Sequence, residues 1–186
     1  MPMPEVAWGR ITPAQVGQLL ALHSIYSDTV LRTPFIARAY AGPLAEHIMA
    51  TLQQAVSGKP TEQAIGGVQS KLVFLVGHDT NIETLAGLLN LHWLLDEPSA
   101  DPTSTGDALV FELYGDAQNS QFMVRAYYVS QSMMQMRNTT PLDLDHPPAM
   151  APIAIPGCSD GSDANACPLD RFACIVQRST AAEEHP

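Results

Sequence analysis

The stretch Lys71-Leu-Val-Phe-Leu-Val-Gly-His-Asp-Thr-Asn81 decides how the fold of this chain is interpreted. Its apolar run, residues 72–76, has no alternating polar positions and predicts a strand that is buried on both faces. Gly77 ends the run, and a helix-like segment follows. We therefore expect a buried strand that delivers an imidazole, His78, and a carboxylate, Asp79, to the start of a helix.

The start of a helix is a favourable place for an anion, because its first N–H groups lack partners. Thr80 and Glu83 form a possible capping box for this helix. A protonated His78 would add a positive donor, and Asp79 could give a proton to a departing oxygen. The structural alternative is that Asp79 only caps the helix and His78 is an ordinary turn residue. A metal-dependent phosphohydrolase of the His-Asp type is disfavoured, because its His-Asp pair lies within a helical domain.

Bulk composition describes a globular chain. Its 186 residues suffice for one domain with a core, and 46% of them are hydrophobic. The net charge of −10 disfavours nucleic acid and anionic membranes as partners. No apolar run approaches the roughly 20 residues that span a bilayer. The first residues lack the basic region and apolar core of a signal peptide.

Periodicity outside this stretch predicts helices and a hairpin. Thr12 and Gln15 form a capping box for an early helix, and a second helix is expected from Pro43 to a stop at Gly58. Residues 108–114 and 122–130 are expected to pair as an antiparallel hairpin, and residues 169–177 as a last helix. The tail from about 179 to 186 is expected to be disordered. One buried strand and a hairpin make a thin sheet.

The three cysteines indicate whether the protein resides in an oxidising or a reducing compartment. Cys158 and Cys167 bracket a polar loop that can fold back, and a bridge there would contribute about 2.5–3 kcal/mol. Such a bridge indicates an oxidising compartment, whereas the alternative is two free thiols in a surface loop. Cys174 lies in an apolar helical segment and is expected to be a buried, inert thiol. The spacing of the three does not match a metal site.

Several other residues have ordinary structural interpretations. His23 is expected in the core or at a pocket edge, and Trp8 is expected to pack. Asp96, Glu97 and Asp101 are expected to form a solvated acidic loop.

The turn after the apolar run, Gly77-His-Asp-Thr-Asn81, resembles the distal motif of the histidine acid phosphatases. Further blocks resemble the bacterial phytase and glucose-1-phosphatase branch of that family, and they occur in the family's order. These blocks are Trp8-Gly-Arg-Ile-Thr12, Arg32-Thr-Pro34, Leu109-Val-Phe-Glu112, Gln135-Met-Arg137, Thr140-Pro-Leu142 and Gly157-Cys158.

The resemblance implies hydrolysis of phosphomonoesters, such as phytate or sugar phosphates, without a metal or other cofactor. In the family a histidine of an Arg-His-Gly motif attacks phosphorus and forms a phosphohistidine. By resemblance, His78 binds the phosphate, Asp79 is the general acid and Thr80 contacts the substrate. Gly77 and Asn81 would shape the turn.

The chain departs from the family in one respect: none of its six histidines follows an arginine, so it contains no Arg-His-Gly motif. We therefore expect residues 1–186 to be the C-terminal part of one histidine acid phosphatase α/β domain with a mostly parallel or mixed sheet. An N-terminal half would complete that sheet and the active site. The intact protein is expected in the periplasm or secreted. The alternative is a catalytically inert fragment or a phosphate-binding module.

Overall fold

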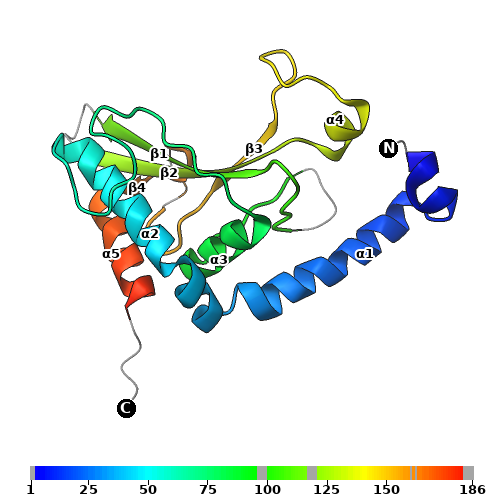
Figure 1. Ribbon diagram of the computed structural model, residues 1–186, viewed down its shortest axis with the longest axis horizontal. Helices are drawn as coiled ribbons and strands as arrows, with labels where there is room; N and C mark the ends of the chain where they lie inside the picture. Colours follow the sequence, from blue (N-terminus) through cyan, green and yellow to red (C-terminus); the bar gives the residue numbers. More distant parts are fainter. Residues whose placement is uncertain (1–2, 96–99, 117–120, 160, 162, 182–186) are drawn as a thin grey trace.

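The fold is an antiparallel sheet covered on one face by helices (Figure 1). The structure is a computed structural model that describes residues 3–95, 100–116, 121–159, 161 and 163–181. Three helices form the covering layer: α2 (Pro34–Ser57), α3 (Asp79–Leu89) and α5 (Leu169–Thr180). A short helix, α4 (Met133–Asn138), and a 3₁₀ turn, η3 (Asp163–Asn165), lie in the connections.

The sheet is built around the predicted hairpin. Its strands are β1 (Ala108–Asp116), β2 (Gln121–Ser130), β3 (Ala149–Ile153) and β4 (Cys167–Pro168). β2 pairs with the other three, and every pairing is antiparallel. The α/β class is confirmed. The expectation of a mostly parallel or mixed sheet is wrong for the strands that the structure describes.

The core lies between this sheet and the helices. Alternate residues of β2 point inward and are buried, as period-two patterning requires, and Tyr128 is among them. Its ring stacks on Trp93 with centroids 4.2 Å apart. The helices supply the opposite side of the core with Leu52, Leu85, Ala86, Leu89, Phe172 and Val176. The chain therefore has a continuous core of its own.

Residues 72–76 do not form the expected buried strand. They belong to no sheet, and no backbone hydrogen bond joins them to another described residue. The exposed fractions are 82% for Leu72, 76% for Phe74 and 88% for Val76. The prediction was wrong because a strand apolar on both faces is stable only between neighbours, and no described strand pairs with this segment.

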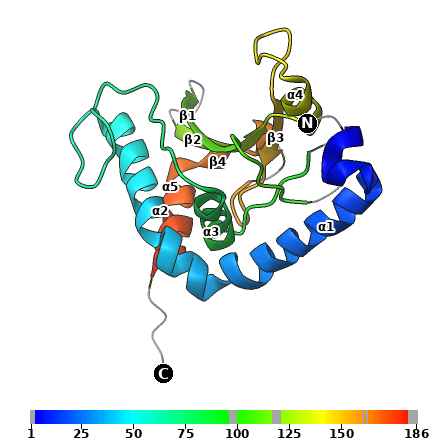
Figure 2. The same cartoon turned by 45° about the vertical axis from the view of Figure 1, so that its right-hand side comes forward.

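The N-terminal part runs out from the body of the fold, as Figures 1 and 2 show. It comprises a 3₁₀ segment, η1 (Met3–Gly9), the helix α1 (Pro13–Tyr26) and a π-helical turn, η2 (Ser27–Leu31). The predicted capping box is confirmed, since the N–H of Thr12 donates to Oε1 of Gln15 at 2.8 Å. His23 and Trp8 are exposed, so their expected packing is wrong: no described element covers them.

Helix boundaries differ in two places. α2 begins at Pro34 and continues through Pro43, nine residues earlier than expected, and ends as predicted before Gly58. α5 continues to Thr180, so residues 179 and 180 are helical rather than tail, and residues 182–186 lie outside the described part. No helix in the described ranges is long and apolar enough to span a bilayer.

Candidate functional site

The turn at residues 77–81 is built as a helix start, as predicted. The backbone of His78 is still extended, with φ −116° and ψ 167°, and Asp79 is the first residue of α3. The backbone N–H of His78 donates to Oδ1 of Asn81 at 2.8 Å, and that of Thr80 donates to Oδ1 of Asp79 at 2.7 Å. The cap therefore involves His78 and Asn81, and the expected pairing of Thr80 with Glu83 is wrong.

Gly77 leaves the space that the Asn81 side chain occupies. A Cβ atom at residue 77 would lie 2.8 Å from Oδ1 of Asn81 and 3.3 Å from its Cγ. Real Cβ atoms do not approach so closely, so any larger residue would displace the amide that holds the His78 backbone. Gly77 and Asn81 therefore fix the backbone of this turn together.

The three residues predicted to act on the substrate lie together at the open end of α3. His78 and Asp79 are exposed, and Thr80 is half-buried. Within the described ranges no basic side chain forms an ion pair with Asp79. The turn thus offers an imidazole and a carboxyl group to a ligand, whereas the N–H groups of Thr80 and Asn81 donate to acceptors within the turn itself.

A hollow of about 870 Å³ lies elsewhere, between β3 and residues 92–95, 100 and 101. Its walls include Trp93, Asp101 and Met150, but not His78 or Asp79. The candidate site is therefore not part of this hollow.

Glu83 of α3 forms a buried ion pair that the sequence did not predict. The guanidinium of Arg32 lies 3.3 Å from Oε2 of Glu83 and 3.6 Å from Oδ2 of Asp101. Oδ1 of Asp101 also accepts the backbone N–H of Trp93 at 2.6 Å. Asp101 is therefore not the solvated residue expected, and Asp96 and Glu97 lie outside the described residues. The partners are 51 and 69 positions apart, so no periodicity reveals them.

A second buried polar group lies under β1 and β2. The hydroxyl of Tyr128 donates to Asp107, and the hydroxyl of Ser130 donates to the other oxygen of the same carboxylate at 2.6 Å. Burial, and then the hydrogen bond and negative charge of Asp107, raise the pKa of Tyr128 far above its usual value of 10.0. This group stabilises the sheet and lies outside the turn.

The cysteine predictions have different outcomes. Cys158 and Cys167 form the expected disulfide, with their Cα atoms 5.3 Å apart. Cys174 is free but exposed, so the expected burial is wrong. The reason lies in helical spacing, because Phe172 and Val176 occupy the inner face of α5. No group of three or more potential metal ligands occurs among the residues described.

The amino-acid sequence of this chain is similar to that of several known proteins. The model of the histidine phosphatase superfamily (branch 2) matches residues 13–129. The chain is 36% identical over 179 residues to the phytase AppA of Escherichia coli (strain K12), covering 95% of this chain and 40% of that protein. It is 33% identical over 184 residues to a glucose-1-phosphatase of Salmonella typhimurium, covering 98% of this chain and 41% of that protein.

A solved structure gives the same relation in three dimensions. Hafnia alvei phytase in complex with myo-inositol hexakis sulphate superposes with a TM-score of 0.82 at 36% identity. The match covers 96% of this chain and 44% of that one. The chain thus spans about two fifths of the length of the curated relatives it matches, and corresponds to their C-terminal half.

Proposed function

Because the chain belongs to branch 2 of the histidine phosphatase superfamily, we propose that it supplies the phosphate-binding and proton-donating part of a phosphomonoester hydrolase. His78 holds the phosphate through its imidazole. Asp79 is the general acid, and Thr80 contacts the substrate. The observation that supports this proposal is the turn itself, in which Asn81 and Gly77 hold His78 and Asp79 at the open end of a helix.

The proposed reaction proceeds in two steps without a metal or other cofactor. A histidine outside this chain attacks phosphorus, so that a P–N bond forms while the P–O bond to the leaving group breaks. The proton of Asp79 passes to the departing oxygen, which leaves as an alcohol. Water then attacks phosphorus and gives a proton to the Asp79 carboxylate, so that the P–N bond breaks, phosphate is released and the acid form of Asp79 is restored. The imidazole of His78 stabilises the charge on the phosphoryl oxygens throughout.

The attacking histidine is proposed to come from polypeptide that corresponds to the N-terminal half of the relatives. That half is the partner needed to complete the sheet and the active site. The proposed substrates are small phosphomonoesters, phytate or a sugar phosphate, because relatives include phytases and a glucose-1-phosphatase. The Hafnia alvei phytase complex with inositol hexakis sulphate supports a highly charged small ligand.

The proposed location of the intact protein is the periplasm or the extracellular space. The Cys158–Cys167 disulfide supports it, since such bonds persist in oxidising compartments. The net charge of −10 is unfavourable for nucleic acid or anionic membranes, so neither is proposed as a partner.

A second candidate is an inert fragment or phosphate-binding module, favoured by the absence of an Arg-His-Gly motif from the sequence. The test compares residues 1–186 alone with a chimera in which the N-terminal half of the Escherichia coli phytase AppA precedes them. We expect the chain alone not to turn over p-nitrophenyl phosphate near pH ~5, since losing a covalent nucleophile can cost about a millionfold. The chimera should be active. An inactive, folded chimera would favour the second candidate.

A further inference from the structure

The side chains of His78 and Asp79 have no support from outside their own turn. Oδ1 of Asp79 accepts hydrogen bonds from the N–H and the hydroxyl of Thr80, and the N–H of His78 donates to Asn81. Among the residues that the structure describes, no side-chain hydrogen bond or ion pair joins His78 or Asp79 to a residue beyond the turn. The position of both side chains therefore depends on the position of α3.

Glu83 lies one helical turn after Asp79, on the same row of α3. Its side chain is buried, and each of its oxygens has a partner on another segment of the chain. Oε2 lies 3.3 Å from Nη1 of Arg32, and Oε1 accepts the hydroxyl of Thr103 at 3.0 Å. Hydrogen bonds to a charged group are strong and directional, whereas apolar contacts are not directional. The bonds of Glu83 thus specify where α3 lies more sharply than its apolar face does.

Arg32 contacts α3 at two further points on this row. Gly87 follows Glu83 by four residues, and a Cβ atom at Gly87 would lie 2.5 Å from the Cα of Arg32. Nη2 of Arg32 donates to the carbonyl of Leu91, another four residues along the chain. Arg32 therefore touches positions 83, 87 and 91, which follow Asp79 at intervals of four residues.

From these contacts we propose that Glu83 is a positioning residue for Asp79. The inference rests on the proposed function, in which Asp79 gives a proton to the leaving oxygen. Proton transfer requires the two heavy atoms to lie about 2.6–3.2 Å apart, and a displacement of about 1 Å can cost roughly 100-fold in rate. By holding α3 against Arg32 and Thr103, Glu83 keeps the Asp79 carboxyl group within reach of the leaving oxygen.

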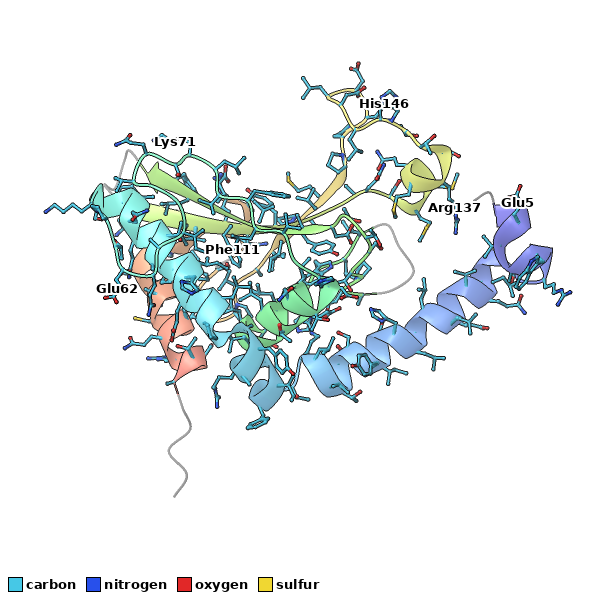
Figure 3. All side chains as sticks on the ribbon, in the orientation of Figure 1. Glu5, Glu62, Lys71, Phe111, Arg137 and His146 are labelled. Carbon is cyan, nitrogen blue, oxygen red and sulfur yellow. A yellow bond between two sulfur atoms is a disulfide. The ribbon has the colours of Figure 1, made fainter. Side chains whose placement is uncertain are left out.

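Replacement of Glu83 releases α3 but leaves the charge of Arg32 paired. Asp101 and Asp28 lie 3.6 Å and 3.8 Å from the guanidinium, and neither belongs to α3. A control for the same replacement is available at Glu62, which is exposed and lies apart from α3 in Figure 3.

The ratio of kcat values on two substrates tests the positioning role. In the chimera with the N-terminal half of the Escherichia coli phytase AppA, Glu83→Ala should lower kcat for an alkyl phosphate about 10–100-fold more than kcat for p-nitrophenyl phosphate. Lost stability alone leaves this ratio unchanged, because both substrates are measured on one sample with one folded fraction. Glu62→Ala should keep the ratio of the parent. An unchanged ratio in folded Glu83→Ala would overturn the proposal.

Glu83→Gln separates position from charge. The glutamine carbonyl can accept from Arg32 while its amide donates to the hydroxyl oxygen of Thr103, so both bonds remain although the charge is lost. The ratio in this variant should stay within about 3-fold of that of the parent. A decrease as large as that in Glu83→Ala would assign the effect to charge and contradict the positioning role.

Gly87→Ala displaces α3 without altering Glu83, because the added Cβ atom would collide with the Cα of Arg32. Alanine favours the helix, so this variant tests the proposal even where Glu83→Ala does not fold. We expect the same ratio to fall by about 10-fold or more. A ratio equal to that of the parent would count against the proposal.

Residues 1–186 alone allow a measurement that does not depend on activity. Residual dipolar couplings of backbone N–H groups report the orientation of α3 relative to β2. Glu83→Ala and Gly87→Ala should reorient α3, whereas Glu83→Gln and Glu62→Ala should keep the orientation of the parent. An orientation unchanged in both Glu83→Ala and Gly87→Ala would overturn the inference.

The two measurements separate this inference from the proposed function. If Asp79→Asn lowers the ratio in an active chimera but Glu83→Ala does not, the function stands and the inference fails. If the parent chimera hydrolyses neither substrate, the proposed function fails and with it the role of Asp79. The fixing of α3 by Glu83 would then still be tested by the dipolar couplings.

Discussion

Arg32 and Glu83 form an ion pair in which both side chains are removed from solvent: they are 6% and 2% exposed, with Nη1 and Oε2 3.3 Å apart. The pair joins the end of η2 to the middle of α3, and the same guanidinium donates to the carbonyl of Leu91. Removing one member leaves the other charge buried without compensation, which costs about 3–5 kcal/mol.

We therefore expect Arg32→Met to lower the free energy of unfolding by about 3–5 kcal/mol, measured with urea at neutral pH. The matched control is Arg171→Met on the exposed side of α5, which should stay within about 0.5 kcal/mol of the parent. A loss below about 1 kcal/mol at Arg32 would show that water or a rearranged partner compensates Glu83.

Asn81 and Gly77 should be energetically coupled. Asn81→Ala removes the acceptor of the His78 N–H and should destabilise the protein by about 1 kcal/mol. Gly77→Ala should cost about 1–3 kcal/mol, because the added Cβ collides with the Asn81 amide. In the double variant the collision is absent, so the total should be smaller than the sum of the single changes. Strict additivity in thermal unfolding would argue against the contact.

The disulfide should account for a large share of stability. Replacing Cys158 and Cys167 by serine should lower the free energy of unfolding by about 2–5 kcal/mol, because the bridge restricts the unfolded chain. Cys174→Ser is the control, and its exposure predicts a change within about 0.5 kcal/mol. Titration of the unfolded protein should find one thiol before reduction and three after it; three before reduction would contradict the bridge.

Tyr128 should make stability fall at high pH. Its folded-state pKa is raised above the unfolded value of 10.0, first by burial and then by Asp107. The neutral phenol is thus favoured in the fold, so its contribution is complete below about pH 10 and is lost as pH rises further, by about 1.4 kcal/mol per unit. Tyr128→Phe should remove this component of the slope in urea unfolding between pH 8 and 11. An unchanged slope would assign the loss to other groups.

We expect Asp79 to contribute most to the hydrolysis of esters that have poor leaving groups. In the chimera, Asp79→Asn removes a proton donor whose help is worth about 10²–10⁴-fold. The decrease in kcat should be large for alkyl phosphates and small for p-nitrophenyl phosphate, whose leaving group needs little protonation. Equal decreases for both substrates would argue against the general-acid role.

Local signals predicted the parts of the fold that depend on local physics. The hairpin, the Thr12 cap, the stop at Gly58 and the helix after Gly77 follow from periodicity and end signals. The burial predicted for residues 72–76 was wrong, because an apolar run indicates burial but does not identify the residues that would cover it. Likewise the ion pair of Arg32 and Glu83 joins distant residues, and no pattern in the sequence connects them. Chain order also predicted that His78 and Asp79 stand at the start of a helix, whereas the hydrogen bond from the His78 N–H to the Asn81 side chain depends on the three-dimensional arrangement of the turn.

The π-helical turn η2 joins the projecting helix α1 to the body of the fold. The 14 residues of α1, at about 1.5 Å each, form an arm of roughly 21 Å. At the base of this arm Arg32 is clamped by Glu83 and lies against Gly87, where an added Cβ would be 2.5 Å from the Arg32 Cα. A rotation of about 10° within η2 would move the far end by roughly 4 Å. Conversely, a force applied near Thr12 would be transmitted as torque to α3, the helix that begins with Asp79.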